Sequence, residues 1–343
     1  MTGNTLTLDQ ARDLAHALRD EIGKVVVGQD AVVEEVLIVL LAGGHALLEG
    51  VPGLGKTLLV RSLASALELS FSRVQFTPDL MPADIVGTQV LIESDGGRRA
   101  LEFRKGPVFT QVLLADEINR ATPKTQSALL EAMQEGQVTA GGTTHPLPRP
   151  FFVLATENPI EMEGTFPLPE AQLDRFLLKL HVPFPTLAEL DAIVDRTTGV
   201  AAPSIARRAS AADVLALHHL VREVLVAQAV KHYALRLVMA THPETQDAPA
   251  ETRRFVRYGA SPRGAQALIL AAKARAVLHG RANAAFEDVA AVALSALRHR
   301  VLVNYEAEAE GLSADALVSR LIAQIPTIAG ERGRELTEAA GRA

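Results

Sequence analysis

The sequence predicts an α/β domain built on a parallel β-sheet, followed by a smaller domain made of helices. The first reason is alternation, because short strand-like runs and longer helix-like segments take turns along the first half of the 343 residues. The second is that three of these runs are nearly all apolar, which suits strands buried on both faces. The third is a change near residue 185, beyond which the patterns are almost entirely helical. We therefore expect two domains, residues 1–185 and 186–343.

In the first half, five runs have strand character, and helices separate them. One helix is expected over 56–69 and another over 122–136, in which Thr122 would cap the helix, Pro123 would occupy its first turn and Gly136 would end it. Such alternation implies parallel strands joined by right-handed crossovers. The strand-like runs cover residues 45–49, 71–76, 112–117, 151–156 and 176–182.

Two segments interrupt the alternation and have the pattern of β-hairpins. Residues 88–104 alternate apolar and polar residues on either side of a turn at 95–97, which reads Asp-Gly-Gly. Residues 137–148 are predicted to form a second hairpin just ahead of the fourth strand. From the pattern alone, each hairpin is more simply explained as a ribbon at the edge of the sheet.

The second half is predicted to consist of helices. The stretch 241–262 is polar and broken by prolines, so we expect a loop there. The predicted helices cover residues 186–197, 211–228, 263–279, 285–299 and 313–325.

Composition excludes several classes of protein. The chain has no cysteine, which excludes disulfides and thiolate metal sites, and its ten histidines lack the same-face spacing that a metal site needs. A net charge of −6 gives no general attraction to nucleic acid. The longest apolar stretch, 31–42, is too short and too charged to span a membrane, and the N-terminus lacks the features of a secretory signal. We therefore expect a cytoplasmic protein.

The segment GVPGLGKT, residues 50–57, fits the phosphate-binding pattern G-x-x-x-x-G-K-[ST]. Phosphates need several inward-pointing backbone N–H groups, which glycines make accessible, and a helix N-terminus adds positive potential. Lys56 would reach the outer phosphates, and the Thr57 hydroxyl would bind Mg²⁺. The loop therefore predicts binding of a nucleoside triphosphate by residues Gly50, Val51, Pro52, Gly53, Leu54, Gly55, Lys56 and Thr57.

A pair of acidic residues ends the third predicted strand. Asp116 and Glu117 would stand at the carboxyl end of a buried strand, where open α/β sheets bind their ligands. Asp116 would hold Mg²⁺ directly or through water, and Glu117 would orient and deprotonate the attacking water. Alone, such a pair is as easily a solvated strand end. Downstream of a phosphate-binding loop, it favours hydrolysis over a slow nucleotide switch.

Three further polar residues are candidates for the same site. Asn158 lies just beyond the fourth predicted strand, and its amide would reach the water or the γ-phosphate if that strand neighbours the acidic pair; an Asn before Pro159 also favours a turn. Arg175 precedes the last strand and would be a surface residue or the partner of Glu170. Arg263 stands in the first turn of a helix, where its charge opposes the helix dipole, so an anionic partner is favoured.

Taken in order, these pieces resemble an AAA+ ATPase, and the connecting segments resemble the MoxR family. The likeness covers about residues 20 to 325. It implies an αβα P-loop core with a five-stranded sheet and a small helical lid, assembled into a ring that usually has six subunits, with ATP and Mg²⁺ as cofactors. The segments that carry it are 75–87, 113–135, 155–176 and 259–269.

The resemblance also implies roles for single residues. Residues 50–57 would be the Walker A motif and residues 116–117 the Walker B motif. Asn158 would be sensor 1, Arg175 the arginine finger that reaches a neighbour's nucleotide, and Arg263 sensor 2 in the lid.

Two smaller implications follow from the same resemblance. Val27 and Gly28 match the stretch that lines the adenine pocket. The hairpins would be the helix-2 insert and the pre-sensor-1 insert, both facing the pore, which replaces the edge-ribbon interpretation. One departure is Glu157, which stands beside sensor 1 where glutamine is expected.

The leading hypothesis is therefore a ring ATPase that remodels or activates a partner protein, such as one with a von Willebrand A domain, often for metal or cofactor insertion. A nucleic-acid motor or loader is the first alternative, and it predicts basic hairpins. Arg98 and Arg99 lie in the first hairpin, whereas the second has no Lys or Arg; the pairs 207–208 and 253–254 are expected to be solvated arginines. A non-motor nucleotide switch is the second alternative.

Overall fold

The computed structural model describes residues 6–93, 99–159, 164–199, 204–246 and 248–327. These residues form two compact units. Unit 1 contains Asp13–Phe176 and Leu180–Ala216, and unit 2 contains Leu6–Arg12, Leu177–Lys179 and the residues from Leu217 onward. The domain boundary at residue 185 stays a prediction.

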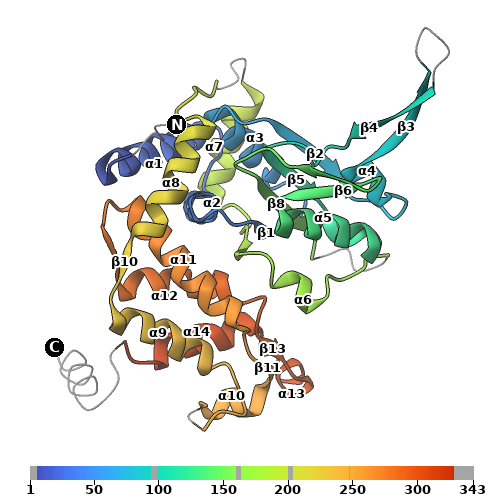
Figure 1. Cartoon of the computed structure of the whole chain (residues 1–343). Coiled ribbons are helices and arrows are strands. Elements are labelled where there is room, and N and C mark those ends of the chain that lie inside the picture. The colour runs from blue at the N-terminus through green and yellow to red at the C-terminus, as the bar shows by residue number, and fades with distance from the viewer. Residues whose placement is uncertain (1–5, 94–98, 160–163, 200–203, 247, 328–343) are drawn as a thin grey trace. The chain divides into compact units, whose positions relative to one another are not determined.

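A five-stranded parallel sheet forms the centre of unit 1, as predicted (Figure 1). The strand order is β2-β5-β8-β1-β9, so β5 and β8 are neighbours and β2 lies at one edge. Each of the five strand-like runs is confirmed, because apolar runs of this length suit strands buried between helices. The strands are β1 (Ala46–Glu49), β2 (Phe71–Gln75), β5 (Val112–Asp116), β8 (Phe152–Glu157) and β9 (Leu178–His181).

Helices flank this sheet, and the two that were predicted between strands are confirmed. α5 ends at Gly136, which has the left-handed conformation (φ 61°) that favours glycine. Thr122 is at the N-cap position, but its hydroxyl lies 3.3 Å from that of Thr125 and makes no capping bond to the described backbone. The elements are α2 (Asp30–Ala42), α3 (Lys56–Ala66), α4 (Pro82–Val86), the 3₁₀ turn η1 (Ile118–Arg120), α5 (Pro123–Glu135), α6 (Glu170–Leu173) and α7 (Leu187–Thr198). Two more helices, α1 (Leu8–Gly23) and α8 (Ala211–Glu223), have residues assigned to both units.

Both predicted hairpins are present, and neither joins the central sheet. β3 (Gly87–Glu93) pairs with β4 (Arg99–Lys105), and β6 (Gln137–Ala140) pairs with β7 (Thr143–Pro146), each as a separate two-stranded sheet. The edge-ribbon interpretation is therefore wrong, and Figure 1 shows β3 and β4 projecting from the core. The two hairpins meet where the rings of Phe103 and His145 stack at 4.1 Å. The predicted turn at 95–97 and Arg98 lie outside the described residues.

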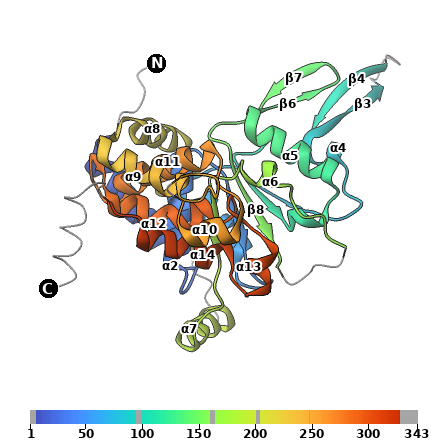
Figure 2. The same cartoon turned by 90° about the horizontal axis from the view of Figure 1, so that it is seen from below.

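In unit 2, helices α9, α11, α12 and α14 pack together, as both views show (Figures 1 and 2). Two expectations were wrong. The predicted helix 211–228 ends at Glu223, because the chain becomes extended to pair with a distant strand. The predicted loop 241–262 contains a short helix, whose Thr252 hydroxyl donates to the carbonyl of Ala240 (2.7 Å). The elements are β10 (Leu225–Val226), α9 (Gln228–Met239), α10 (Ala250–Phe255), β11 (Val256–Tyr258), α11 (Pro262–Leu278), β12 (Asn283–Ala284), α12 (Phe286–Leu297), β13 (Leu302–Val303), α13 (Tyr305–Ala309) and α14 (Ala314–Gln324).

Within the part of the chain that the structure describes, no helix combines the length and the apolarity needed to cross a membrane.

His45 links three elements at the start of β1. Its Nδ1 accepts a hydrogen bond from the N–H of Val153 in β8 (3.1 Å), and its Nε2 donates to the carbonyl of Met133 in α5 (3.1 Å). This arrangement requires a neutral ring. Burial lowers the pKa of His45 to about 4, although the bond to Met133 acts in the opposite direction.

We predict an acid-sensitive stability that depends on His45. Because its folded pKa lies below the ordinary value of 6.5, the unfolded chain binds the proton more tightly. The stabilisation is therefore complete above pH 6.5 and is lost as the pH falls toward 4, by about 2 kcal/mol at pH 5. Urea unfolding at pH 7.5 and pH 5 measures this loss. The loss should shrink in His45→Gln and persist in the control His219→Gln; equal losses in all three proteins would contradict the prediction.

Candidate functional site

The loop between β1 and α3 has the backbone geometry of a phosphate cradle. Gly53 (φ 86°) and Gly55 (φ 77°) are left-handed, a conformation that side-chain-bearing residues rarely adopt. A Cβ atom at Gly50 would lie 3.0 Å from the Cβ of Val182, the residue that follows β9. Backbone conformation therefore favours glycine at positions 53 and 55, and the tight approach to Val182 favours it at position 50.

Lys56 begins α3 and is buried at the base of this loop. Its Nζ donates to the carbonyl of Gly50 (2.6 Å). Burial lowers the pKa of Lys56, while the charges of Asp116, Glu117 and Glu49 act to raise it. The ammonium group therefore shares one electrostatic site with the acidic pair. Thr57 follows in the first turn of the same helix.

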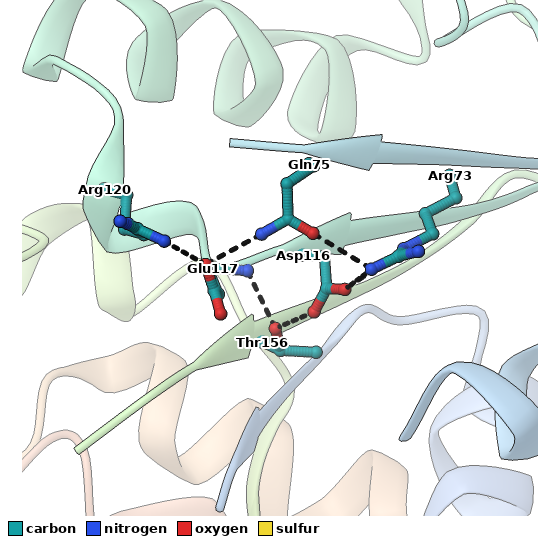
Figure 3. Close-up of polar contacts among 6 residues, drawn as sticks. All are labelled: Arg73, Gln75, Asp116, Glu117, Arg120 and Thr156. Carbon is teal, nitrogen blue, oxygen red and sulfur yellow. Dashed lines mark hydrogen bonds and ion pairs between the residues drawn. The ribbon is translucent and has the colours of Figure 1, made fainter. Parts of the chain in front are cut away.

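The acidic pair is held from the neighbouring strand by Thr156 (Figure 3). The Thr156 hydroxyl donates to Oδ1 of Asp116 (2.6 Å) and accepts from the N–H of Glu117 (2.8 Å). Glu117 has φ 56°, and among the described non-glycine residues only Glu68 shares a positive φ. Such conformations cluster at functional sites. A single buried hydroxyl thus holds the carboxylate of Asp116 and the backbone of Glu117.

Cationic and amide groups contact the outer oxygens of the pair (Figure 3). Arg73 of β2 donates from Nε (3.1 Å) and Nη2 (2.6 Å) to Oδ2 of Asp116. Oε2 of Glu117 accepts from Nε2 of Gln75 (2.7 Å) and from Nη1 of Arg120 (3.0 Å). The sequence interpretation missed Arg73, Gln75, Arg120 and Thr156. The only signal for any of them was that positions 73 and 75, two residues apart in a predicted strand, lie on the same face of that strand.

The proposed role of Asn158 required the strand before it to neighbour the strand of the acidic pair, and the two strands are neighbours. It follows β8 directly, and β8 pairs with β5, which ends at Asp116. The residue is 4% exposed. Just before it, the carbonyl of Glu157 accepts from the N–H of Gly50 (3.4 Å), which ties this strand end to the phosphate loop.

The stretch at Val27 and Gly28 also lies next to the loop. Gln29 donates from Nε2 to the carbonyl of Leu54 (2.8 Å). Gly28 has φ 70°, a left-handed conformation that favours glycine, and the Glu189 side chain lies close to its Cα. This stretch is therefore fixed between the loop and α7.

The two arginines lie in different settings. Arg175 donates from Nη1 to the carbonyl of Leu130 in α5 (2.8 Å), and its buried Nε makes no hydrogen bond within the described residues. It is thus anchored by one nitrogen rather than solvated. Arg263 belongs to unit 2, where it is exposed in the first turn of α11 and its backbone N–H donates to Oγ of Ser261 (3.1 Å).

The fold and the loop together define a class: a P-loop α/β ATPase core accompanied by a helical lid. The profile of the ATPase family associated with various cellular activities (AAA) matches residues 45–178, and that of the AAA lid domain matches residues 249–321. The crystal structure of a protein from Cytophaga hutchinsonii superposes with a TM-score of 0.87 at 42% identity, covering 94% of this chain and 97% of that one.

Curated relatives narrow the class. The chain is 44% identical over 302 residues to Chaperone MoxR1 of Mycobacterium tuberculosis, which is 88% of this chain and 79% of the relative. It is 34% identical over 315 residues to Protein MoxR of Methylorubrum extorquens, covering 85% and 89%. The chain belongs to the MoxR family of AAA+ ATPases.

Proposed function

We propose that this chain binds MgATP at residues 50–57 and hydrolyses it in a ring of six copies, in order to remodel or activate a partner protein. The observation that carries the proposal is the convergence of three elements. The phosphate loop with the buried Lys56 follows β1, and the Asp116–Glu117 pair ends β5; both lie at the carboxyl edge of the sheet, on either side of β8.

The residues present fit a magnesium nucleotide. Lys56 Nζ bonds a neutral carbonyl at the loop, and a phosphate oxygen would be a stronger acceptor for it. Among the described residues there is no group of three or more acidic or histidine side chains that would hold a metal. That suits Mg²⁺, which uses one or two protein oxygens together with phosphates and water. Thr57 and Asp116 would supply those oxygens.

Each residue of the site would then have a distinct task. Bound Mg²⁺ would neutralise charge that develops on the β- and γ-phosphates. Glu117 would accept the proton of the attacking water, and Thr156 keeps its backbone in place for that step. Asn158 would orient the water or the γ-phosphate. Val27 and Gly28 would line the adenine pocket.

Assembly and the partner belong to the proposal as well. Arg175 would complete the site of a neighbouring copy, and Arg263 would couple the lid to the γ-phosphate. One relative carries the name of a chaperone, which supports a protein as the partner. A von Willebrand A domain protein is the partner that the family resemblance favours.

A nucleic-acid partner finds less support in the surface charges. Arg207 pairs with Glu68, and Arg208 pairs with the buried Glu21 at 2.7 Å. Arg254 pairs with glutamates of α13 and of the turn that follows it. These arginines are largely neutralised rather than free to bind phosphates, and Arg98 lies outside the described residues.

The test is Lys56→Ala. We expect its affinity for MgATP to fall by roughly 100-fold and its hydrolysis to vanish, because the main charge-assisted bond to the phosphates is removed. Isothermal titration and phosphate release measure the two effects. The control is Lys124→Ala, on the exposed side of α5. Unchanged MgATP affinity in Lys56→Ala, or a wild-type chain that does not hydrolyse ATP in any assembly state, would refute the proposal.

A further inference from the structure

Arg73 and Asp116 form an ion pair that occupies the proposed metal ligand. β2 and β5 run in parallel register, with Arg73 opposite Leu114 and Gln75 opposite Asp116. The Arg73 side chain therefore follows β2 toward the carboxyl end of β5. There, Nε and Nη2 both donate to the same oxygen, Oδ2 of Asp116, and Nη2 also donates to Oε1 of Gln75 (3.0 Å).

Asp116 has little capacity left for another partner. An ionised carboxylate offers about four acceptor positions, two on each oxygen. Arg73 fills both positions on Oδ2, and the Thr156 hydroxyl fills one on Oδ1. A magnesium ion, or a water bound to it, would therefore have to share Oδ1 with Thr156 or take the place of Arg73.

Exposure and charge both favour Arg73 as the group that leaves. The Arg73 side chain is 46% exposed, whereas that of Asp116 is 12% exposed and is held by Thr156. Before a metal arrives, Arg73 and Arg120 balance the two adjacent carboxylates. A dication added at the same place would repel the nearby guanidinium, and that guanidinium can turn into water at little cost.

We propose that Arg73 is a positioning residue that holds Asp116 in the metal-free site and is displaced from it when the magnesium nucleotide binds. The inference rests on the proposed MgATP site. In this inference, Arg73 and the metal compete for one carboxylate oxygen of Asp116. Arg73 thereby keeps Asp116 oriented and the acidic pair neutralised between turnovers, and lowers the affinity for Mg²⁺ so that the metal leaves with the product.

The competition has a thermodynamic signature that a purely structural ion pair lacks. If Arg73 must release Asp116, its removal destabilises the metal-free state alone and strengthens the coupling between Mg²⁺ and nucleotide. If Arg73 only supports the fold, its removal weakens both states equally and the coupling stays unchanged. The coupling is the ratio of the ADP dissociation constant in EDTA to that in Mg²⁺, so any direct effect of Arg73 on nucleotide affinity cancels.

The experiment measures binding of a fluorescent ADP derivative to the full chain in EDTA and in Mg²⁺. For Arg73→Gln we expect the coupling ratio to rise about threefold to tenfold, as fits the loss of a partly exposed, charge-assisted pair. Melting temperature in EDTA should fall, and the increase on adding MgADP should grow. Arg73→Lys keeps the charge but cannot donate from two guanidinium nitrogens, so its coupling ratio should be intermediate. The control is Arg207→Gln, which removes an ion pair with Glu68 that does not touch Asp116.

A coupling ratio that is unchanged or lowered in Arg73→Gln would overturn the inference. Should that variant fail to fold, Arg73→Lys decides the matter by the same ratio. A wild-type chain that binds no ADP under either condition would instead refute the proposed function, so the two failures are distinguishable.

Discussion

Glu117→Gln is expected to bind MgATP with near wild-type affinity and to hydrolyse it about 100-fold to 10,000-fold more slowly, the range typical for removal of a general base. Glutamine has the same shape and can still accept the bonds from Gln75 and Arg120 through its amide oxygen. The backbone bond from Glu117 to Thr156 is independent of the side chain. The substitution removes the negative charge of the side chain and, with it, the capacity to take a proton.

Steady-state phosphate release and a separate titration with MgATP distinguish the two steps for this variant. Because hydrolysis no longer resets the site, the nucleotide-bound ring should accumulate, which sedimentation in MgATP will detect. Glu131→Gln, an exposed glutamate of α5, is the matched control and should turn over normally. Normal turnover in Glu117→Gln would disprove its assignment as the base and favour a nucleotide switch.

Arg175→Ala should bind MgATP and lose about 1,000-fold to 100,000-fold in hydrolysis, the contribution of an arginine supplied to the transition state. In the structure, Arg175 is anchored through Nη1 to Leu130 and keeps Nε unengaged within the described residues. The bond to Leu130 thus holds the side chain in place. Arg207→Ala, which removes an exposed ion pair of the same unit, is the control for a general effect of losing an arginine.

Mixing separates action between copies from action within one. Lys56→Ala chains are expected to bind nucleotide weakly and not to hydrolyse it, but they retain Arg175; Arg175→Ala chains bind nucleotide but lack the arginine. A mixed ring would place an intact Arg175 beside an occupied site, so partial activity should return and should be greatest at intermediate ratios. No recovery at any ratio would contradict action between copies. Thermal melting of Arg175→Ala checks that loss of the bond to Leu130 has not unfolded the chain.

Local patterns were enough to predict the sheet, the phosphate loop and the acidic pair. Each is encoded in a short, contiguous run: an apolar strand, a glycine-rich turn before a helix, or two carboxylates at a strand end. Helix α2 escaped prediction because most of its residues are buried, which leaves it without the polar face that reveals a helix in sequence. The short α10 was missed because it lies among polar residues and prolines, a composition that indicates a loop.

The surroundings of the acidic pair could not be predicted in the same way. Arg73 and Asp116 are 43 residues apart, and Thr156 and Asp116 are 40 apart. Their contacts depend on β2, β5 and β8 being neighbours, and on a register that places position 75 opposite position 116. A slip of one residue would turn Arg73 to the other face of the strand.

The amino-acid sequence by itself therefore determined the class of fold, the family and the chemical groups of the site, because these follow from residue types at fixed local spacing. The tertiary structure alone decided which side chains hold those groups. Thr156 holds the carboxylate of Asp116 and the backbone of Glu117, Arg73 occupies an oxygen of Asp116, and Gln75 and Arg120 contact Glu117. The physical reason is that strand order and register bring distant residues within hydrogen-bonding distance, and neither is written in any single segment of the chain.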